Sequence, residues 1–387
     1  MHWAHTLRIP SRLLWFDLDE PVGSEMIPTG GNLIVDQTEE VSAALRRDFV
    51  SLGGYAVAGQ VFGLLESELD LIHMTLDRGT TSEERTSHLE ELTNDLGTLV
   101  VKVMPLAVLS PALKTLHSIR SLLDQRQPTR HQVRLVRTSA KLSAIVGEIM
   151  FNVGQFQKAQ EWYKTAEHAA YDAGDRYLAD IALAGQAYLP TYSEDPRGVL
   201  ALLEPRLESS PSPSPAIAWL WGFSARAHAA LSEPDDFKRA IEHARDCLER
   251  SSPDLVTAGI FSFLPEKLAF YEATGAVRLN DPERAVSAAD RALSLYDLSE
   301  TTEPALAKLE RASALAEAGE VPEACRVAKA ALLDPSTYHG VTVRTYACKF
   351  DALIRGIQSP ETREWREVRA VVHGRKNTIA KINDREV

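Results

Sequence analysis

Apolar residues recur every three or four positions along most of the chain, and proline or glycine separates one such stretch from the next. This spacing is typical of amphipathic helices that each bury one face. Between residues 39 and 127 it predicts four helices, the third with an N-cap within Thr81-Ser82-Glu83-Glu84 and the fourth over Pro111–Asp124. The residues that interrupt the pattern are Gly53, Gly54, Gly79, Pro105 and Pro128.

The most regular stretch runs from Leu142 to Ala166. Its small residues let two helix backbones approach closely, Gly154 allows a turn between the helices, and its aromatic residues fill the space beside them. With Gly147 numbered as position 8 of a repeating unit, the other residues are Gly154 at position 15, Phe156 at 17, Ala159 at 20, Tyr163 at 24 and Ala166 at 27.

The same order of small residues recurs three times, with Ala225, Ala273 and Ala312 at position 8, and a degenerate copy contains Gly185. This pattern resembles the tetratricopeptide repeat, a pair of antiparallel helices that must stack on neighbouring pairs to bury its apolar face. The resemblance implies an all-α chain in which residues 128–372 form a right-handed superhelical solenoid. Residues 39–127 would be a divergent helical cap or degenerate repeats, and residues 373–387 a polar tail.

The N-terminal segment suggests a second resemblance. His5-Thr6-Leu7-Arg8-Ile9-Pro10, followed by Leu13, Leu14 and Trp15, resembles the last helix of a lambda-repressor-like helix-turn-helix domain. In bacterial regulators of the xenobiotic-response-element family such a domain precedes tetratricopeptide repeats. We expect residues 1–20 to be a remnant of this domain without its DNA-reading helices, or a plain N-terminal helix. Residues 21–38 are rich in glycine and proline and are expected to be a linker.

Composition narrows the class of protein. The formal net charge of −12 argues against nucleic-acid binding over the whole surface. No apolar run reaches the roughly 18 residues that a membrane-spanning helix needs, so no membrane is expected as a partner. The three cysteines are widely spaced, which favours a reducing cytoplasm over a disulfide framework.

Residues that could carry catalysis do not assemble into a known pattern. The sequence contains no glycine-rich phosphate loop and no Gly-x-Ser-x-Gly elbow. His2 and His5 have no third ligand nearby in the sequence, and His228 and His243 lie within one repeat. We therefore expect no enzymatic activity, no cofactor, no metal site and no catalytic residues.

Ligand binding is the better prospect, because the resemblance implies that positions 2, 5, 9, 12 and 13 line a concave wall. Lys141, Glu148 and Asn152 occupy such positions in the first unit, and Asn152 could hold a peptide backbone through its amide. Extended backward, the same helix face carries Arg137, Arg134 and Arg130, which makes a cationic stripe for an anionic group. The alternatives for this stripe are a solvated face or ion pairs with a neighbouring helix. The other units contribute Gln186, Arg226, Lys267 and Arg278 to the same wall.

These patterns lead to two hypotheses about function. The first is a cytoplasmic bacterial transcriptional regulator, or its ligand-sensing repeat domain, which binds a peptide, a small-molecule signal or a partner protein in the concave groove. DNA would then be reached only through a missing or separate helix-turn-helix module, and a homodimer is one arrangement that the sequence leaves open. The alternative is a scaffold for protein–protein interaction that senses no small ligand.

Overall fold

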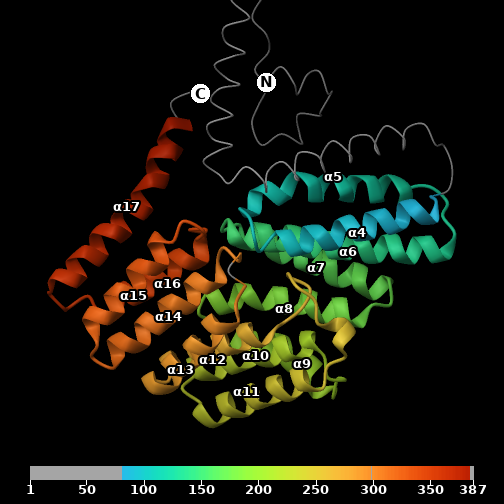
Figure 1. The fold of residues 1–387 in the computed structure, drawn as a ribbon. Helices are drawn as coiled ribbons and strands as arrows, with labels where there is room; N and C mark the ends of the chain where they lie inside the picture. Colours follow the sequence, from blue (N-terminus) through green and yellow to red (C-terminus); the bar gives the residue numbers. More distant parts are fainter. Residues whose placement is uncertain (1–80, 298, 384–387) are drawn as a thin grey trace, which may run out of the picture. The chain divides into compact units, whose positions relative to one another are not determined.

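The computed structural model describes residues 81–297 and 299–383, and every regular element in these ranges is helical. The all-α prediction is confirmed for this part of the chain (Figure 1). A 3₁₀ helix covers Pro253–Leu255. The fourteen α-helices of the described residues are α4 (Glu83–Leu99), α5 (Pro105–Leu123), α6 (Thr129–Asn152), α7 (Phe156–Asp172), α8 (Arg176–Tyr192), α9 (Pro196–Glu208), α10 (Pro215–Ala230), α11 (Pro234–Glu249), α12 (Pro265–Arg278), α13 (Pro282–Leu295), α14 (Glu303–Glu317), α15 (Val321–Leu333), α16 (Val341–Leu353) and α17 (Pro360–Asn383).

Consecutive helices pack as pairs from α6 to α15, and short turns join the two members of each pair (Figure 1). Each turn between paired helices contains a residue with positive φ, a conformation that ends a helix and reverses the chain. Gly154 and Gly319 supply it without steric cost. The residues with positive φ in the other three turns are Glu194, Ser232 and Asn280.

Aromatic side chains fit against glycines where one pair meets the next. The ring of Tyr163 on α7 lies against Gly147 of its own pair and Gly185 of α8, and a Cβ built on Gly185 would come within 2.3 Å of this ring. Phe237 on α11 meets Gly275 of α12 in the same way, at 2.2 Å from a Cβ built there. The small residues therefore let neighbouring pairs interlock, as the sequence predicted for Gly147 and Tyr163.

The first helices of the pairs form a continuous row. In this row α6 contacts α8, α8 contacts α10, and the contacts continue through α12 and α14 to α16. The last helix of the row also contacts the first, since α16 packs on α6. At this junction a Cβ built on Gly340 would come within 3.2 Å of the carbonyl oxygen of Asn152. The inner faces of these helices therefore surround a common interior.

Two predicted boundaries differ from those observed. The sequence pattern placed the fourth helix of the N-terminal part at Pro111, but α5 begins at Pro105. Proline suits the first helical position because its missing N–H would have no intrahelical partner there. At the other end, α17 continues past residue 372 to Asn383, into the segment predicted to be a polar tail. The remnant or N-terminal helix expected over residues 1–20, the linker over 21–38, and the predicted helices over residues 39–80 lie outside the described residues.

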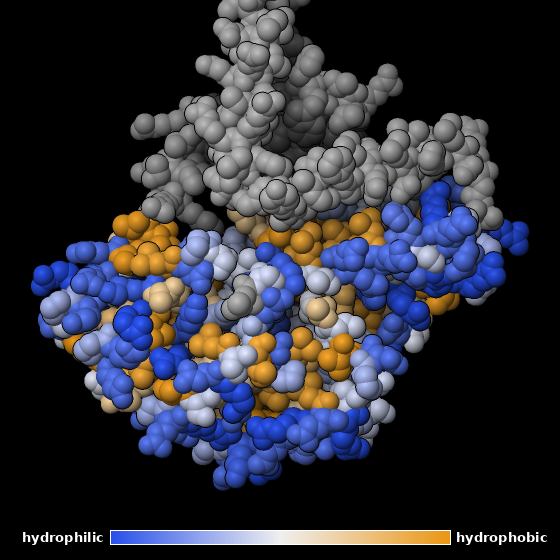
Figure 2. Space-filling view, viewed as in Figure 1, coloured by the Kyte–Doolittle hydropathy of each residue, from blue (hydrophilic) through white to orange (hydrophobic). Residues whose placement is uncertain are grey.

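Apolar side chains remain exposed on the first described pair. The space-filling view shows apolar residues gathered over α5, where Met104, Leu106 and Leu113 are exposed (Figure 2).

Candidate functional site

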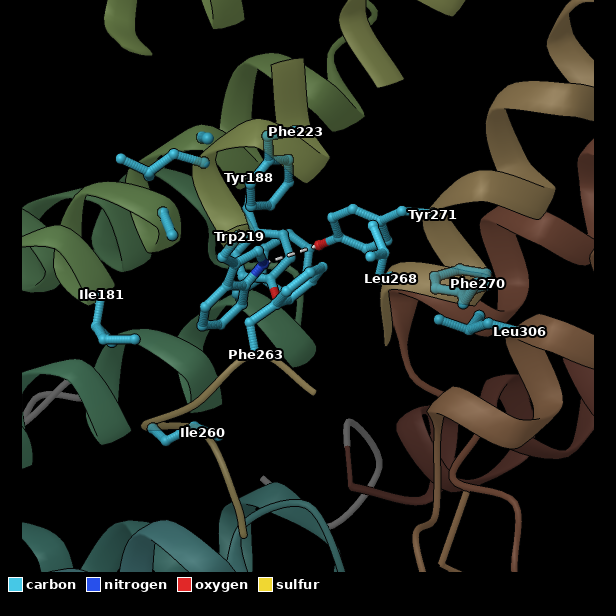
Figure 3. Packing of buried hydrophobic residues seen from close by; sticks show 14 of the residues in the cluster. Ile181, Tyr188, Trp219, Phe223, Ile260, Phe263, Leu268, Phe270, Tyr271 and Leu306 are labelled. Carbon is cyan, nitrogen blue, oxygen red and sulfur yellow. Dashed lines mark hydrogen bonds between the residues drawn. The ribbon is translucent and has the colours of Figure 1, made fainter. Parts of the chain in front are cut away.

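Aromatic residues fill much of the interior that the row of helices surrounds. Trp219 of α10 stacks on Phe263 with ring centroids 5.8 Å apart, and its indole N–H donates to the hydroxyl of Tyr271 at 3.1 Å (Figure 3). Tyr188 of α8 packs edge-on against Phe223, and stacks on Phe151 of α6 at 4.5 Å. The positions that were expected to line a concave wall thus lie mainly in a packed core. Space remains in two cavities between these side chains.

A small cavity of about 50 Å³ lies within this core. Glu148, Asn152 and Arg226 are among its lining residues. The carboxylate of Glu148 accepts from the hydroxyl of Tyr163 at 2.8 Å and from the amide of Asn152 at 2.7 Å. Burial raises the pKa of Glu148. The amide of Asn152 also donates to the Glu148 carbonyl at 2.9 Å, so its N–H groups are already hydrogen-bonded within the chain in this structure.

A buried ion pair lies beside the small cavity. The ammonium group of Lys267 is 2.7 Å from the carboxylate of Glu303 and 4.6 Å from the centroid of the Trp219 ring. Glu300 is close to this pair, and burial together with the charge of Glu303 raises its pKa to about 8. The α4–α5 turn covers this end of the interior, since the amide of Thr301 donates to the carbonyl of Val101 at 3.1 Å.

The larger cavity has a volume of about 490 Å³ and lies at the C-terminal ends of α8, α10, α12, α14 and α16. This volume is within the range of small-molecule sites. Three successive units contribute positions 9 and 13, two of the positions expected to line the wall. These residues are Arg226 and Ala230 on α10, Thr274 and Arg278 on α12, and Ser313 and Glu317 on α14.

Three charged side chains form a linked group at the more exposed side of this cavity. Arg278 donates to the carboxylate of Glu194 at 2.5 Å, and Lys349 of α16 donates to the same carboxylate at 2.7 Å. Burial lowers the pKa of Lys349, although Glu194 opposes the shift. The Glu194 side chain is 48% exposed, so solvent reaches this group.

The inner part of the cavity holds Arg226, Glu310 and Tyr346. Glu310 is only 6% exposed, and burial raises its pKa. The guanidinium of Arg226 donates to the hydroxyl of Tyr346 at 3.1 Å and lies 4.7 Å from the centroid of the Tyr271 ring. Aromatic faces stabilise a cation but do not neutralise it. The cavity therefore combines the aromatic ring of Tyr346 with charges of both signs.

The stability of the protein should fall as pH rises through the neutral range. The folded pKa values of Glu300 (about 8) and Glu317 (about 7) exceed the ordinary glutamate value of 4.5, so the folded state binds more protons than the unfolded state at pH values between 4.5 and these folded values. The contribution of these two groups to the free energy of unfolding is fully present below about pH 4.5, and it is lost as pH rises through their folded pKa values. We expect urea unfolding to give a lower free energy at about pH 9 than at about pH 5.

The variant Glu300→Gln should flatten this pH dependence, because it removes the carboxylate with the higher of the two pKa values. Glu320→Gln is the matched control, since Glu320 is exposed at the start of α15 and the charge change is the same. If the free energy of unfolding fell equally steeply with pH in the wild type and in Glu300→Gln, the raised pKa of Glu300 would be contradicted.

Three of the four cations of the cationic stripe already have partners elsewhere in the chain. Arg134 binds the carboxylates of Glu83 and Glu90 on α4, the latter at 2.6 Å. Arg137 lies 3.0 Å from Asp175, and Lys141 donates to the side chain of Asn94 at 2.8 Å. Ion pairing with a neighbouring helix, one of the alternatives left open by the sequence, is observed for Arg134 and Arg137, while Arg130 is exposed. The stripe lines neither of the two interior cavities.

The nine residues expected to bind ligand therefore fall into separate groups. Arg226 and Arg278 line the larger cavity, while Glu148 and Asn152 line the small one together with Arg226. Gln186 is buried and donates to Glu167 of α7 at 2.7 Å. The remaining residues are Lys267, in its buried ion pair, and Arg134, Arg137 and Lys141 of the stripe.

Several charged residues of the larger cavity did not stand out in the sequence. Glu317 occupies position 13 of its unit, as Asn152 does, so the repeat numbering contained a signal for it. Glu310 falls at position 6, outside the expected wall positions. Lys349 and Tyr346 lie on α16, which had no repeat numbering, and Glu194 lies in a turn.

One group of side chains in the described part of the chain has the composition of a metal site. Ligand atoms of His228, Glu233 and Asp236 lie within 4.8 Å of one another. These groups already have partners, since His228 Nδ1 is 2.7 Å from Glu233 and Asp236 pairs with Arg239. They form the turn between α10 and α11 and do not line the larger cavity.

Among the described residues, no helix combines the length and apolar character that crossing a bilayer requires. Comparisons of the chain with protein-family models, with curated proteins and with solved structures find no match. Function must therefore be argued from the cavity itself.

Proposed function

We propose that this chain is the ligand-sensing part of a cytoplasmic, non-enzymatic regulator, with tetratricopeptide-type helix pairs in a right-handed superhelix. Its ligand is a small molecule or the end of a peptide, held in the larger cavity. The observation that supports this proposal is the cavity wall, where positions 9 and 13 of three successive units contribute side chains.

A ligand in this cavity would contact six helices, which are α8 and α9 of one pair, α10, α12 and α14 of three further pairs, and α16. Because these helices belong to several pairs, such a ligand has a different free energy of binding for each relative arrangement of the pairs. It would therefore shift the population toward the arrangement that it fits best. A DNA-binding module or partner protein that contacts the outer helices would respond to this change, so the mechanism needs no chemical step.

A substitution that fills the cavity should abolish ligand binding while the fold is retained. Ala230 lines the cavity and is exposed, so Ala230→Trp occupies ligand space without displacing core side chains. A ligand at a hundred times its dissociation constant adds about 2.7 kcal/mol to the free energy of unfolding. We expect metabolite or short-peptide fractions of a bacterial extract to raise the melting temperature of the wild type and not of Ala230→Trp.

The matched control is Ala201→Trp, an exposed position on α9 away from the cavity, which should keep the ligand response. Loss of the response in both variants would place the ligand elsewhere. If no fraction stabilises the wild type and a defined partner protein does, the chain is a scaffold, which is the alternative function.

A further inference from the structure

Two carboxylates of α14 face the larger cavity without a cation bound to them. Glu310 and Glu317 are two helical turns apart and so lie on one face of the helix. Neither takes part in the ion pairs that the described residues form in this cavity, both of which go to Glu194. The Oε2 atom of Glu317 is buried and has no hydrogen-bond partner among the described residues. A buried polar atom without a partner is costly, which is typical of a position that a ligand completes.

The other walls of the cavity carry the excess positive charge. Arg278 and Lys349 share one carboxylate, that of Glu194, so this group has a net charge of one cation. Arg226 adds a second cation, and its buried Nε–H also has no hydrogen-bond partner among the described residues. A hydrogen-bond donor on α10 and an acceptor on α14, both without a partner among the described residues, thus belong to side chains that line the same cavity.

We propose that this cavity binds a small zwitterion, with its ammonium group held by Glu310 and Glu317 and its carboxylate held by Arg226 and the Arg278–Lys349 pair. This inference rests on the proposed ligand site and adds the chemical class of the ligand. Such a ligand supplies a donor to Oε2 of Glu317 and an acceptor to the Nε–H of Arg226, the two atoms of the site that lack a hydrogen-bond partner among the described residues. A charge-assisted hydrogen bond to a guanidinium or a carboxylate is the strongest polar contact that this lining offers.

Ligands with one kind of charge fit the cavity less well. A dicarboxylate would place one of its negative charges near Glu310 and Glu317, and a diamine would place one of its positive charges near Arg226 and Lys349. Both arrangements bring like charges together in a site where burial weakens solvent screening. The uncharged part of the lining is mainly small or apolar, with Ala227, Val277 and Ala230 among its residues, which suits a short aliphatic body.

The binding of an ammonium group should also depend on pH. Burial and the nearby Glu310 raise the pKa of Glu317 to about 7, and an ammonium group binds the ionised carboxylate. The ionised fraction of such a group rises about tenfold between about pH 6 and about pH 8. Affinity for an amine-bearing probe should increase with pH over this range in the wild type, and should be flat in Glu317→Gln.

The test uses titration calorimetry of the full chain with two matched sets of probes. The first set is γ-aminobutyrate, butylamine and butyrate, and the second is ε-aminocaproate, hexylamine and caproate. We expect a zwitterion from at least one set to bind more tightly than its amine and its acid, and more tightly than the diamine putrescine. Glu317→Gln should weaken the zwitterion by about tenfold to a hundredfold, as expected for a lost charged hydrogen bond. Lys349→Gln should weaken the same probe and its acid analogue.

Glu320→Gln is the matched control and should leave every affinity unchanged, because Glu320 is exposed outside the cavity. The inference is overturned if neither zwitterion binds, if butyrate or caproate binds as tightly as its zwitterion, or if Glu317→Gln keeps wild-type affinity. These outcomes differ from failure of the proposed function, for which Ala230→Trp and the wild type would respond alike to every extract fraction.

Discussion

Replacing Tyr163 with alanine is expected to lower the free energy of unfolding by about 3–5 kcal/mol, the usual cost of removing a buried aromatic side chain. The ring is 4% exposed and is enclosed between Gly147 and Gly185. Because the two residues that enclose the ring are glycines, neither has a side chain that could fill the space that the ring leaves. The loss should appear as a lower midpoint in urea unfolding followed by circular dichroism.

Two further variants separate the contributions of this side chain. Tyr163→Phe keeps the ring but removes the hydroxyl that donates to buried Glu148, which should cost about 1–3 kcal/mol. Tyr171→Ala is the matched control on the same helix, because Tyr171 is 45% exposed and contacts mainly Arg176. It should cost less than about 1 kcal/mol. Equal losses in Tyr163→Ala and Tyr171→Ala would contradict the interlocking role of Tyr163.

The contacts of Tyr163 also indicate how far sequence reasoning reaches in this chain. Small residues at fixed spacing, such as Gly147 and Gly185, predict close helix packing, because only a residue without a bulky side chain allows it. The same numbering identified Arg226 and Arg278, which line the larger cavity. Local periodicity therefore predicted the helices, and the repeat numbering that the resemblance implies identified four residues that line the two cavities.

The remaining features depend on contacts between distant parts of the chain. Packing of α16 on α6 joins residues near 340 to residues near 152, and no local pattern indicates it. Similarly, the cationic stripe on α6 could be interpreted as a ligand site because its partners, Glu83 and Glu90, lie on a helix that carries no repeat signature. Charge patterns on one helix predict a function only when the neighbouring helix is known.

Lys267 is the predicted site residue whose loss should affect stability most. Its ammonium group is 12% exposed and pairs with Glu303, and its charge also lowers the pKa of Glu148 against the larger effect of burial. Lys267→Met keeps the length of the side chain but leaves these carboxylates without a cation. Removing one partner of a buried pair costs about 3–5 kcal/mol. We expect urea unfolding near neutral pH to show a loss of this size.

The loss from Lys267→Met should shrink as pH falls. Without Lys267, the folded pKa of Glu148 rises further above its unfolded value, so protonation at low pH removes the uncompensated charge and restores stability. Adding Glu303→Gln should recover part of the loss in the double variant.

The matched control is Lys308→Met. The ammonium group of Lys308 is 3.0 Å from the carboxylate of Asp334, and both side chains are about one-third exposed, so this variant should cost at most about 1 kcal/mol. If both lysine variants lost the same stability at every pH, Lys267 would be an ordinary surface cation, and the buried carboxylates would have to be stabilised by other groups.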